Sequence, residues 1–105
     1  MIKVEYTTEL TAKQRVIASL KVEGHALGST QNLLSLRVCA GVSAILLGSE
    51  NCFEKDTKIE THKGFYYVIV ESSRDILVLE VIVLQLLKLY NYYPVMFDYF
   101  KEVNK

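Results

Sequence analysis

The chain has 105 residues, half of them apolar, and its 12 lysine and arginine residues balance its 12 aspartate and glutamate residues. This length predicts a single domain, residues 1–105, that a partner subunit would help to cover, because small domains bury a limited share of their apolar surface. A neutral chain without a basic run argues against direct nucleic-acid binding, which depends on clustered cations.

The sequence also predicts no membrane partner. The first six residues alternate charged and apolar side chains, unlike a signal peptide. The apolar stretch over residues 76–84 is interrupted by Glu80 and is shorter than the roughly 20 residues that span a bilayer. Cys39 and Cys52 fall on one expected helix, about 20 Å apart at ~1.5 Å per residue, too far for a disulfide. We therefore expect a reduced, cytoplasmic protein.

The first half of the chain predicts two strands, a loop and a helix. Apolar and polar residues alternate over residues 2–7 and 14–23, which indicates a hairpin. Residues 25–34 contain glycine, serine, threonine and asparagine and predict a mobile loop. Ser35 is the expected N-cap of a helix that continues to about residue 52.

The second half predicts another hairpin, a second helix and a final extended segment. Residues 57–61 and 65–71 read as strands around a turn. Residues 74–91 are rich in valine and isoleucine, but their length and lack of alternation favour a helix. Its polar side chains form one narrow stripe, so this helix should lie in a dimer interface or between the sheet and the first helix. Pro94 ends it, and residues 95–103 form a last strand or tail. The expected fold is α/β, with two helices packed on a small, mostly antiparallel β-sheet.

Two short motifs carry the candidate chemistry. Gly24-His25-Ala26 places a histidine directly after the second strand, and Cys39 lies in the expected first turn of the first helix. A thiol and an imidazole from neighbouring elements are the minimum parts of a cysteine nucleophile with its base. The free amides and partial positive charge of a first helical turn would stabilise the thiolate.

Two further residues have supporting roles to consider. Gly24 would let a substrate carbonyl approach backbone amides that act as oxyanion donors. Ser43, one turn after Cys39, would hydrogen-bond either the thiolate or the loop, or else bond back to the carbonyl of Cys39.

The remaining thiol and imidazole form a weaker pair. Cys52 falls near a helix C-terminus, where the dipole opposes a thiolate, and His62 falls at a hairpin tip. Both read as structural or solvent-facing. Two cysteines and two histidines at these spacings match no compact zinc motif, so no metal is expected.

The two motifs together resemble the ribosomal-processing cysteine protease family (Prp). In that family a strand ends in Gly-His-Ala, a variable loop follows, and a helix opens with a pattern like Val-Cys-Ala-Ala-Val-Ser-Ala. The matching residues here are Gly24, His25, Ala26, Val38, Cys39, Ala40, Val42, Ser43 and Ala44.

The resemblance implies a small α/β fold that forms homodimers and needs no cofactor. It also implies removal of the N-terminal extension from a bacterial large-subunit ribosomal protein, the twenty-seventh in the standard naming. Its partner would be that ribosomal protein precursor. His25 and Cys39 would be the catalytic pair, and Ser43 a supporting residue.

The chain departs from the family pattern at two positions. Leu36 stands where many members carry an aspartate, and Gly41 stands where a second alanine is usual. The lost carboxylate leaves no expected third group to orient His25. A non-enzymatic dimeric module that binds a ribosomal or assembly partner is therefore the alternative function, and a thiol-based redox sensor is the third.

Overall fold

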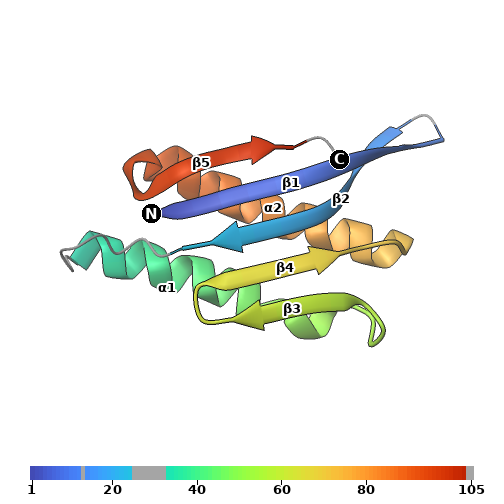
Figure 1. Ribbon diagram of the computed structural model, residues 1–105, viewed down its shortest axis with the longest axis horizontal. Coiled ribbons are helices and arrows are strands. Elements are labelled where there is room, and N and C mark those ends of the chain that lie inside the picture. The colour runs from blue at the N-terminus through green and yellow to red at the C-terminus, as the bar shows by residue number, and fades with distance from the viewer. Residues whose placement is uncertain (13, 25–32, 104–105) are drawn as a thin grey trace.

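The computed structural model describes residues 1–12, 14–24 and 33–103 (Figure 1). The elements are β1 (Ile2–Thr11), β2 (Gln14–Glu23), α1 (Leu33–Gly48), a 3₁₀ turn (Glu50–Cys52), β3 (Lys58–His62), β4 (Phe65–Ile69), α2 (Ser73–Tyr92), a second 3₁₀ turn (Pro94–Met96) and β5 (Phe97–Glu102).

The strands form one sheet in the order β3-β4-β2-β1-β5. Every neighbouring pair is antiparallel except β1 and β5, which run parallel. Both helices cover the same face of this sheet (Figure 1). The predicted fold class, two helices on a mostly antiparallel sheet, is confirmed, and the sheet is mixed only because the last strand returns beside the first.

The first hairpin is longer than the sequence predicts. β1 continues to Thr11, past an irregularity in its pairing with β2 between Thr7 and Thr8. Residues 8–11 are polar or exposed, so their side chains carry no alternating signal, and only the pairing with β2 holds them extended. Ala12, with a φ of 50°, then begins the turn.

Helix α1 begins earlier than expected, and the prediction that Ser35 caps it is wrong. The helix is already formed at Leu33, so Ser35 is its third residue; it is buried and its hydroxyl donates to Met96 Sδ at 3.6 Å. Cys39 is consequently the seventh residue of α1. Only the first four amides of a helix lack a partner within it, so the amide of Cys39 is not one of the free groups that were expected to stabilise its thiolate.

Helix α2 is fixed at its start by a buried carboxylate. The Ser72 side chain caps the helix by accepting from the Asp75 amide at 3.1 Å. Asp75 accepts hydrogen bonds in turn from the Glu54 amide, at 3.0 Å, and from the Thr57 hydroxyl. The segment between the 3₁₀ turn and β3 is therefore tied to the first turn of α2.

The middle of α2 lies in the core, as predicted. The helix contacts β2 on one side and α1 on the other, and Leu79, Ile82, Val83 and Leu86 are buried. Its remaining surface stays apolar and open: Leu77, Val81 and Leu84 are each more than half exposed. Leu36 and Leu47 of α1 are likewise exposed. The two helices thus present apolar side chains to solvent that nothing in the described chain covers.

Helix α1 lies in a second apolar stretch, besides residues 76–84, that bears on the prediction of no membrane partner. Among the described residues, the stretch Leu33–Cys52 is long and apolar enough to cross a membrane by length and composition, with a mean hydropathy of 1.5 and 22% of its window buried. Core helices of soluble proteins pass the same test, and α1 contributes Val38, Val42 and Leu46 to the core. The absence of a membrane partner stays a prediction.

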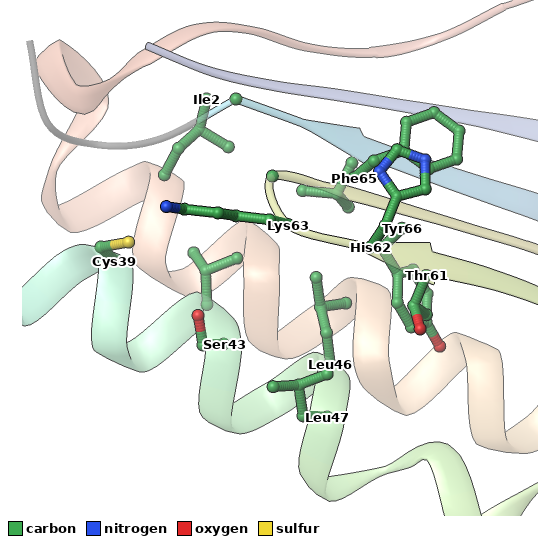
Figure 2. Close-up of a pocket in the computed structure, with 14 residues that line it drawn as sticks. Ile2, Cys39, Ser43, Leu46, Leu47, Thr61, His62, Lys63, Phe65 and Tyr66 are labelled. Carbon is green, nitrogen blue, oxygen red and sulfur yellow. The ribbon is translucent and has the colours of Figure 1, made fainter.

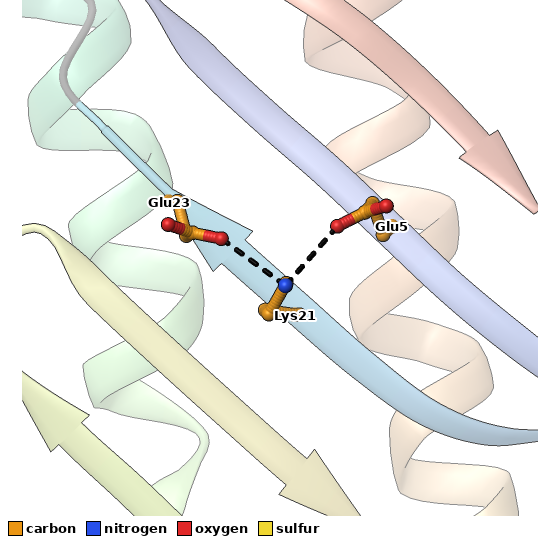
Figure 3. A network of polar contacts seen from close by, with 3 residues as sticks. All are labelled: Glu5, Lys21 and Glu23. Atoms are coloured by element: carbon orange, nitrogen blue, oxygen red, sulfur yellow. Dashed lines mark ion pairs between the residues drawn. The ribbon is translucent and has the colours of Figure 1, made fainter. Parts of the chain in front are cut away.

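The opposite face of the sheet carries charged side chains. Lys21 Nζ lies 3.2 Å from a Glu23 carboxylate oxygen and 3.3 Å from one of Glu5 (Figure 3). Its hydrogen bonds to Glu23 and then Glu5 raise the pKa of Lys21 above its ordinary value. Because these side chains remain partly exposed to solvent, the ion pairs contribute little to stability, but they mark this face as the solvated one.

Candidate active site

A groove of about 410 Å³ lies between α1, the end of β2 and the β3–β4 hairpin. Its walls are mostly apolar. The lining residues are Ile2, Val22, Gly24, Cys39, Val42, Ser43, Leu46, Leu47, Thr61, His62, Lys63, Gly64, Phe65 and Tyr66. The few polar groups of this groove stand out because apolar side chains surround them.

Cys39 is half-buried and its thiol is free. Residues four apart share one face of a helix, so Ser43 lies one turn further along the same wall, as the sequence predicts. Both line the groove (Figure 2). Val38 and Val42, on the next stripe of α1, belong to the core, and Val42 also borders the groove. Packing of the buried face of α1 against the core therefore fixes the position of the Cys39 thiol at the groove.

Ser43 is exposed, and its hydroxyl forms no hydrogen bond with another residue in the described part of the chain. The alternative in which it bonds back to the carbonyl of Cys39 is therefore not observed. The hydroxyl is directed into the groove (Figure 2), where it is available to a bound peptide.

Gly24 has a conformation and an environment that require glycine. Its φ is +90°, and an added Cβ would lie 2.2 Å from the Met1 carbonyl oxygen. Its amide donates to the Gly64 carbonyl at 2.9 Å. This bond ties the end of β2 to the tip of the β3–β4 hairpin, and it also means that the Gly24 amide itself is not free to act as an oxyanion donor.

His25, with the rest of residues 25–32, lies outside the described residues. Its pairing with Cys39 therefore stays a prediction. Gly24, the residue before it in the sequence, lines the same groove as Cys39.

His62 and Cys52 are both exposed, as predicted, but α1 ends at Gly48, so Cys52 does not lie on that helix as expected, and His62 also lines the groove. The His62 side chain is 61% exposed, its ring stacks on Phe65 with centroids 4.7 Å apart, and its Nε2 lies 3.8 Å from a Glu60 carboxylate oxygen. The ring points away from Cys39 (Figure 2). Cys52 is exposed in the 3₁₀ turn and does not line the groove.

Lys63 was not among the site residues predicted from the sequence. This residue lies at the hairpin tip, lines the groove, and extends its side chain across it in the direction of Cys39 (Figure 2). Lysine in a polar turn carries no sequence signal for a site. Only the pairing of β4 with β2 brings the tip opposite α1.

Tyr66 forms part of the apolar wall and is 3% exposed. Its hydroxyl and one Glu50 carboxylate oxygen are buried without a hydrogen-bond partner among the described residues. Burial, and then the negative charge of Glu50, raise the pKa of Tyr66 to about 12. The phenol is therefore neutral at physiological pH.

No group of three or more histidine, cysteine, aspartate or glutamate side chains in the described ranges is arranged to hold a metal. Leu36, at the position where many relatives carry an aspartate, is 46% exposed one turn before Cys39. The polar groups in the lining are thus the thiol of Cys39, the ammonium group of Lys63, the imidazole of His62 and the hydroxyls of Ser43, Thr61 and Tyr66, and the described residues supply no carboxylate to it.

Comparison with known proteins decides the family. A family model described as "Cysteine protease Prp" matches residues 1–98. The chain belongs to the Prp family of cysteine proteases. No curated protein matches it.

Solved Prp-like structures share its fold. A structure of the essential ribosomal processing protease Prp from S. aureus with a substrate peptide has a TM-score of 0.72 and 21% identity, and covers 100% of both chains. The same protease with a covalently linked product peptide gives 0.77 and 22%, covering 98% of this chain and 100% of that one. SMU.848 from Streptococcus mutans gives 0.73 and 18%, covering 100% and 96%. These structures show the shared fold, and the family model identifies the chain as a cysteine protease.

Proposed function

We propose that this Prp-family chain is a cysteine endopeptidase that removes the N-terminal extension from a bacterial large-subunit ribosomal protein, the twenty-seventh in the standard naming. The observation that carries the proposal is a free thiol, Cys39, exposed to an open and largely apolar groove in a chain of this family. Solved relatives of the same fold hold a substrate peptide and a covalently linked product peptide.

The mechanism uses the thiol and the imidazole in sequence. His25 takes the proton of Cys39, and the thiolate forms a bond to the scissile carbonyl carbon. The C–N bond then breaks, and the leaving amine takes the proton from His25. Water hydrolyses the resulting thioester and regenerates the thiol. None of these steps requires a metal or an organic cofactor.

The groove suits an extended peptide. Its apolar walls accept apolar side chains, whose burial is favourable. One rim is formed by the end of β3, the edge strand of the sheet, and an extended peptide can add to a free strand edge through backbone hydrogen bonds. A disordered N-terminal extension meets both conditions.

The protein should be incubated with the precursor of that ribosomal protein and the products identified by mass spectrometry. We expect a single cut within the N-terminal extension. Cys39→Ser and His25→Ala should reduce the rate by at least 100-fold, because serine lacks a thiolate near neutral pH and a positioned base contributes roughly 10²–10⁴-fold.

A precursor that binds but stays intact would instead favour the non-enzymatic binding module. Cleavage by Cys39→Ser at the wild-type rate would show that the nucleophile is another residue.

The exposed apolar side chains of α1 and α2 support the further proposal of a homodimer, which we propose to be cytoplasmic. Leu77, Val81 and Leu84 form an apolar surface on α2 that a second copy would cover. Light scattering after size exclusion tests this directly. A monomer at all micromolar concentrations, with a melting temperature that does not depend on concentration, would contradict the dimer.

A further inference from the structure

Attack of Cys39 on a peptide bond creates a negative charge that needs a partner. As the C–S bond forms, the π electrons of the carbonyl move to its oxygen and give an oxyanion. Removing one donor to such an oxyanion typically costs about 10²–10³-fold in kcat. In cysteine and serine peptidases this donor is often a backbone amide near the nucleophile.

Two described backbone amides that border the groove, those of Cys39 and Gly24, already have hydrogen-bond partners. Cys39 is the seventh residue of α1, so its amide lies beyond the four that remain free at a helix start. The Gly24 amide donates to the Gly64 carbonyl at 2.9 Å. Neither group can turn to the oxyanion without breaking a bond that the fold requires.

Lys63 brings a cation into the groove that Cys39 lines. Its side chain crosses the groove from the hairpin tip in the direction of Cys39 (Figure 2). It forms no ion pair with a carboxylate in the described part of the chain, so its three donors are not taken by one. The Gly24–Gly64 hydrogen bond holds the hairpin tip against the end of β2, which keeps the base of this side chain in place.

We propose that Lys63 is a catalytic residue whose ammonium group donates to the oxyanion formed when Cys39 attacks the substrate. The inference rests on the proposed peptidase function. In this step the thiolate gives an electron pair to the carbonyl carbon, the carbonyl oxygen gains the negative charge, and Lys63 keeps its proton throughout. When the C–N bond breaks, the oxyanion returns its electrons to re-form the carbonyl, and the amine leaves with the proton from His25.

The test uses the variant Lys63→Met, which removes the positive charge and keeps an unbranched side chain of similar length. With the ribosomal protein precursor as substrate, we expect kcat to fall at least tenfold and KM to change less than twofold, because the contact is made in the transition state and not in the ground state. Lys63→Arg keeps a cation and its donors and should recover kcat to within about threefold of wild type. The rate at which iodoacetamide alkylates Cys39 should stay within twofold in Lys63→Arg and should fall less than kcat does in Lys63→Met, because alkylation forms no oxyanion and responds only to the loss of a cation near the thiolate.

Lys58→Met is the matched control. Lys58 is the first residue of β3, the strand that leads to the hairpin tip, and so lies at the opposite end of that strand from Lys63. It is exposed and does not line the groove. Its removal takes away one positive charge and should leave kcat and KM unchanged. Circular dichroism would show that all three variants remain folded.

Three results would overturn the proposal. A wild-type kcat in Lys63→Met would show that Lys63 does not stabilise the oxyanion. A raised KM with an unchanged kcat would show that Lys63 contacts the substrate only in the ground state. An equal loss in Lys63→Arg and Lys63→Met would show that shape matters and charge does not. If the wild-type protein does not cleave the precursor, the proposed function itself fails and the role of Lys63 falls with it. If wild type cleaves while Lys63→Met matches it, only the inference on Lys63 is lost.

Discussion

Replacing Gly24 with alanine should destabilise the protein and inactivate it together, because this residue has three structural constraints. Its φ of +90° is one that side chains with a Cβ rarely adopt, which costs on the order of 1–3 kcal/mol. The new Cβ would lie 2.2 Å from the Met1 carbonyl oxygen, and backbone must move to relieve the overlap, at roughly 1–3 kcal/mol more. The hydrogen bond to the Gly64 carbonyl is then lost or strained.

We therefore expect the Gly24→Ala variant to lose about 2–6 kcal/mol of unfolding free energy. Urea denaturation followed by circular dichroism measures this as a lower midpoint with an unchanged slope. Cleavage of the ribosomal precursor by the fraction that stays folded should also fall, because the residue fixes the hairpin tip, and with it Lys63, against the groove.

Gly48→Ala is the matched control. Gly48 is the last residue of α1, and an added Cβ there meets nothing within 4 Å. That variant should be neutral or slightly more stable, since alanine favours the helix. If Gly24→Ala is as stable and as active as Gly48→Ala, the end of β2 does not require glycine and does not hold the hairpin tip in place.

Three other variants test separate parts of the fold. Val83→Asp should cost about 3–5 kcal/mol in urea unfolding, because Val83 is 5% exposed and its aspartate would be an unpaired buried charge; a fully stable variant would show that α2 is not the core helix. Cys52→Ser should keep wild-type cleavage, since this exposed thiol lies off the groove, and a loss above tenfold would contradict that assignment. Tyr66→Phe should lose less stability than wild type between pH 10 and 12. The raised pKa of Tyr66 contributes stability that is complete below about pH 10 and disappears as pH rises through about 12, on the order of 2–3 kcal/mol; parallel pH profiles would refute this.

Most strands and helices could be predicted from the sequence because the patterns that specify them are local. Alternation over residues 14–23 marks side chains that face the helices or the solvent, and the structure keeps this strand as β2. The strand predicted over residues 65–71 is kept as β4 over Phe65–Ile69. The start of α1 was not readable. Ser35 resembles an N-cap because a polar segment precedes it, but its burial beside Met96, 61 residues away, allows it to sit inside the helix.

The candidate site was predicted only in the part that one helix determines. Cys39 and Ser43 share a face through their spacing alone, so the sequence was sufficient to place them on one wall. Lys63 depends on the pairing of β4 with β2 and on the Gly24–Gly64 hydrogen bond, which join residues about 40 positions apart. A local sequence pattern does not show which residues this far apart in the chain come into contact. The pairing of His25 with Cys39 stays a prediction.

The contact between Met1 and Gly24 also bears on how this protein is produced for experiments. The Met1 carbonyl lies against Gly24, and both Gly24 and Ile2 line the groove. Any residues fused before Met1 would therefore begin beside the groove. An affinity tag placed there would be a tethered peptide at high local concentration, able to occupy the groove or to be cut within it. The other end of the described chain, Val103, is bound to the Tyr6 carbonyl through its amide at 2.8 Å, well along β1 from the groove (Figure 1). Tags for kinetic work therefore belong at the C-terminus, and a tag at the N-terminus gives a built-in assay for self-processing.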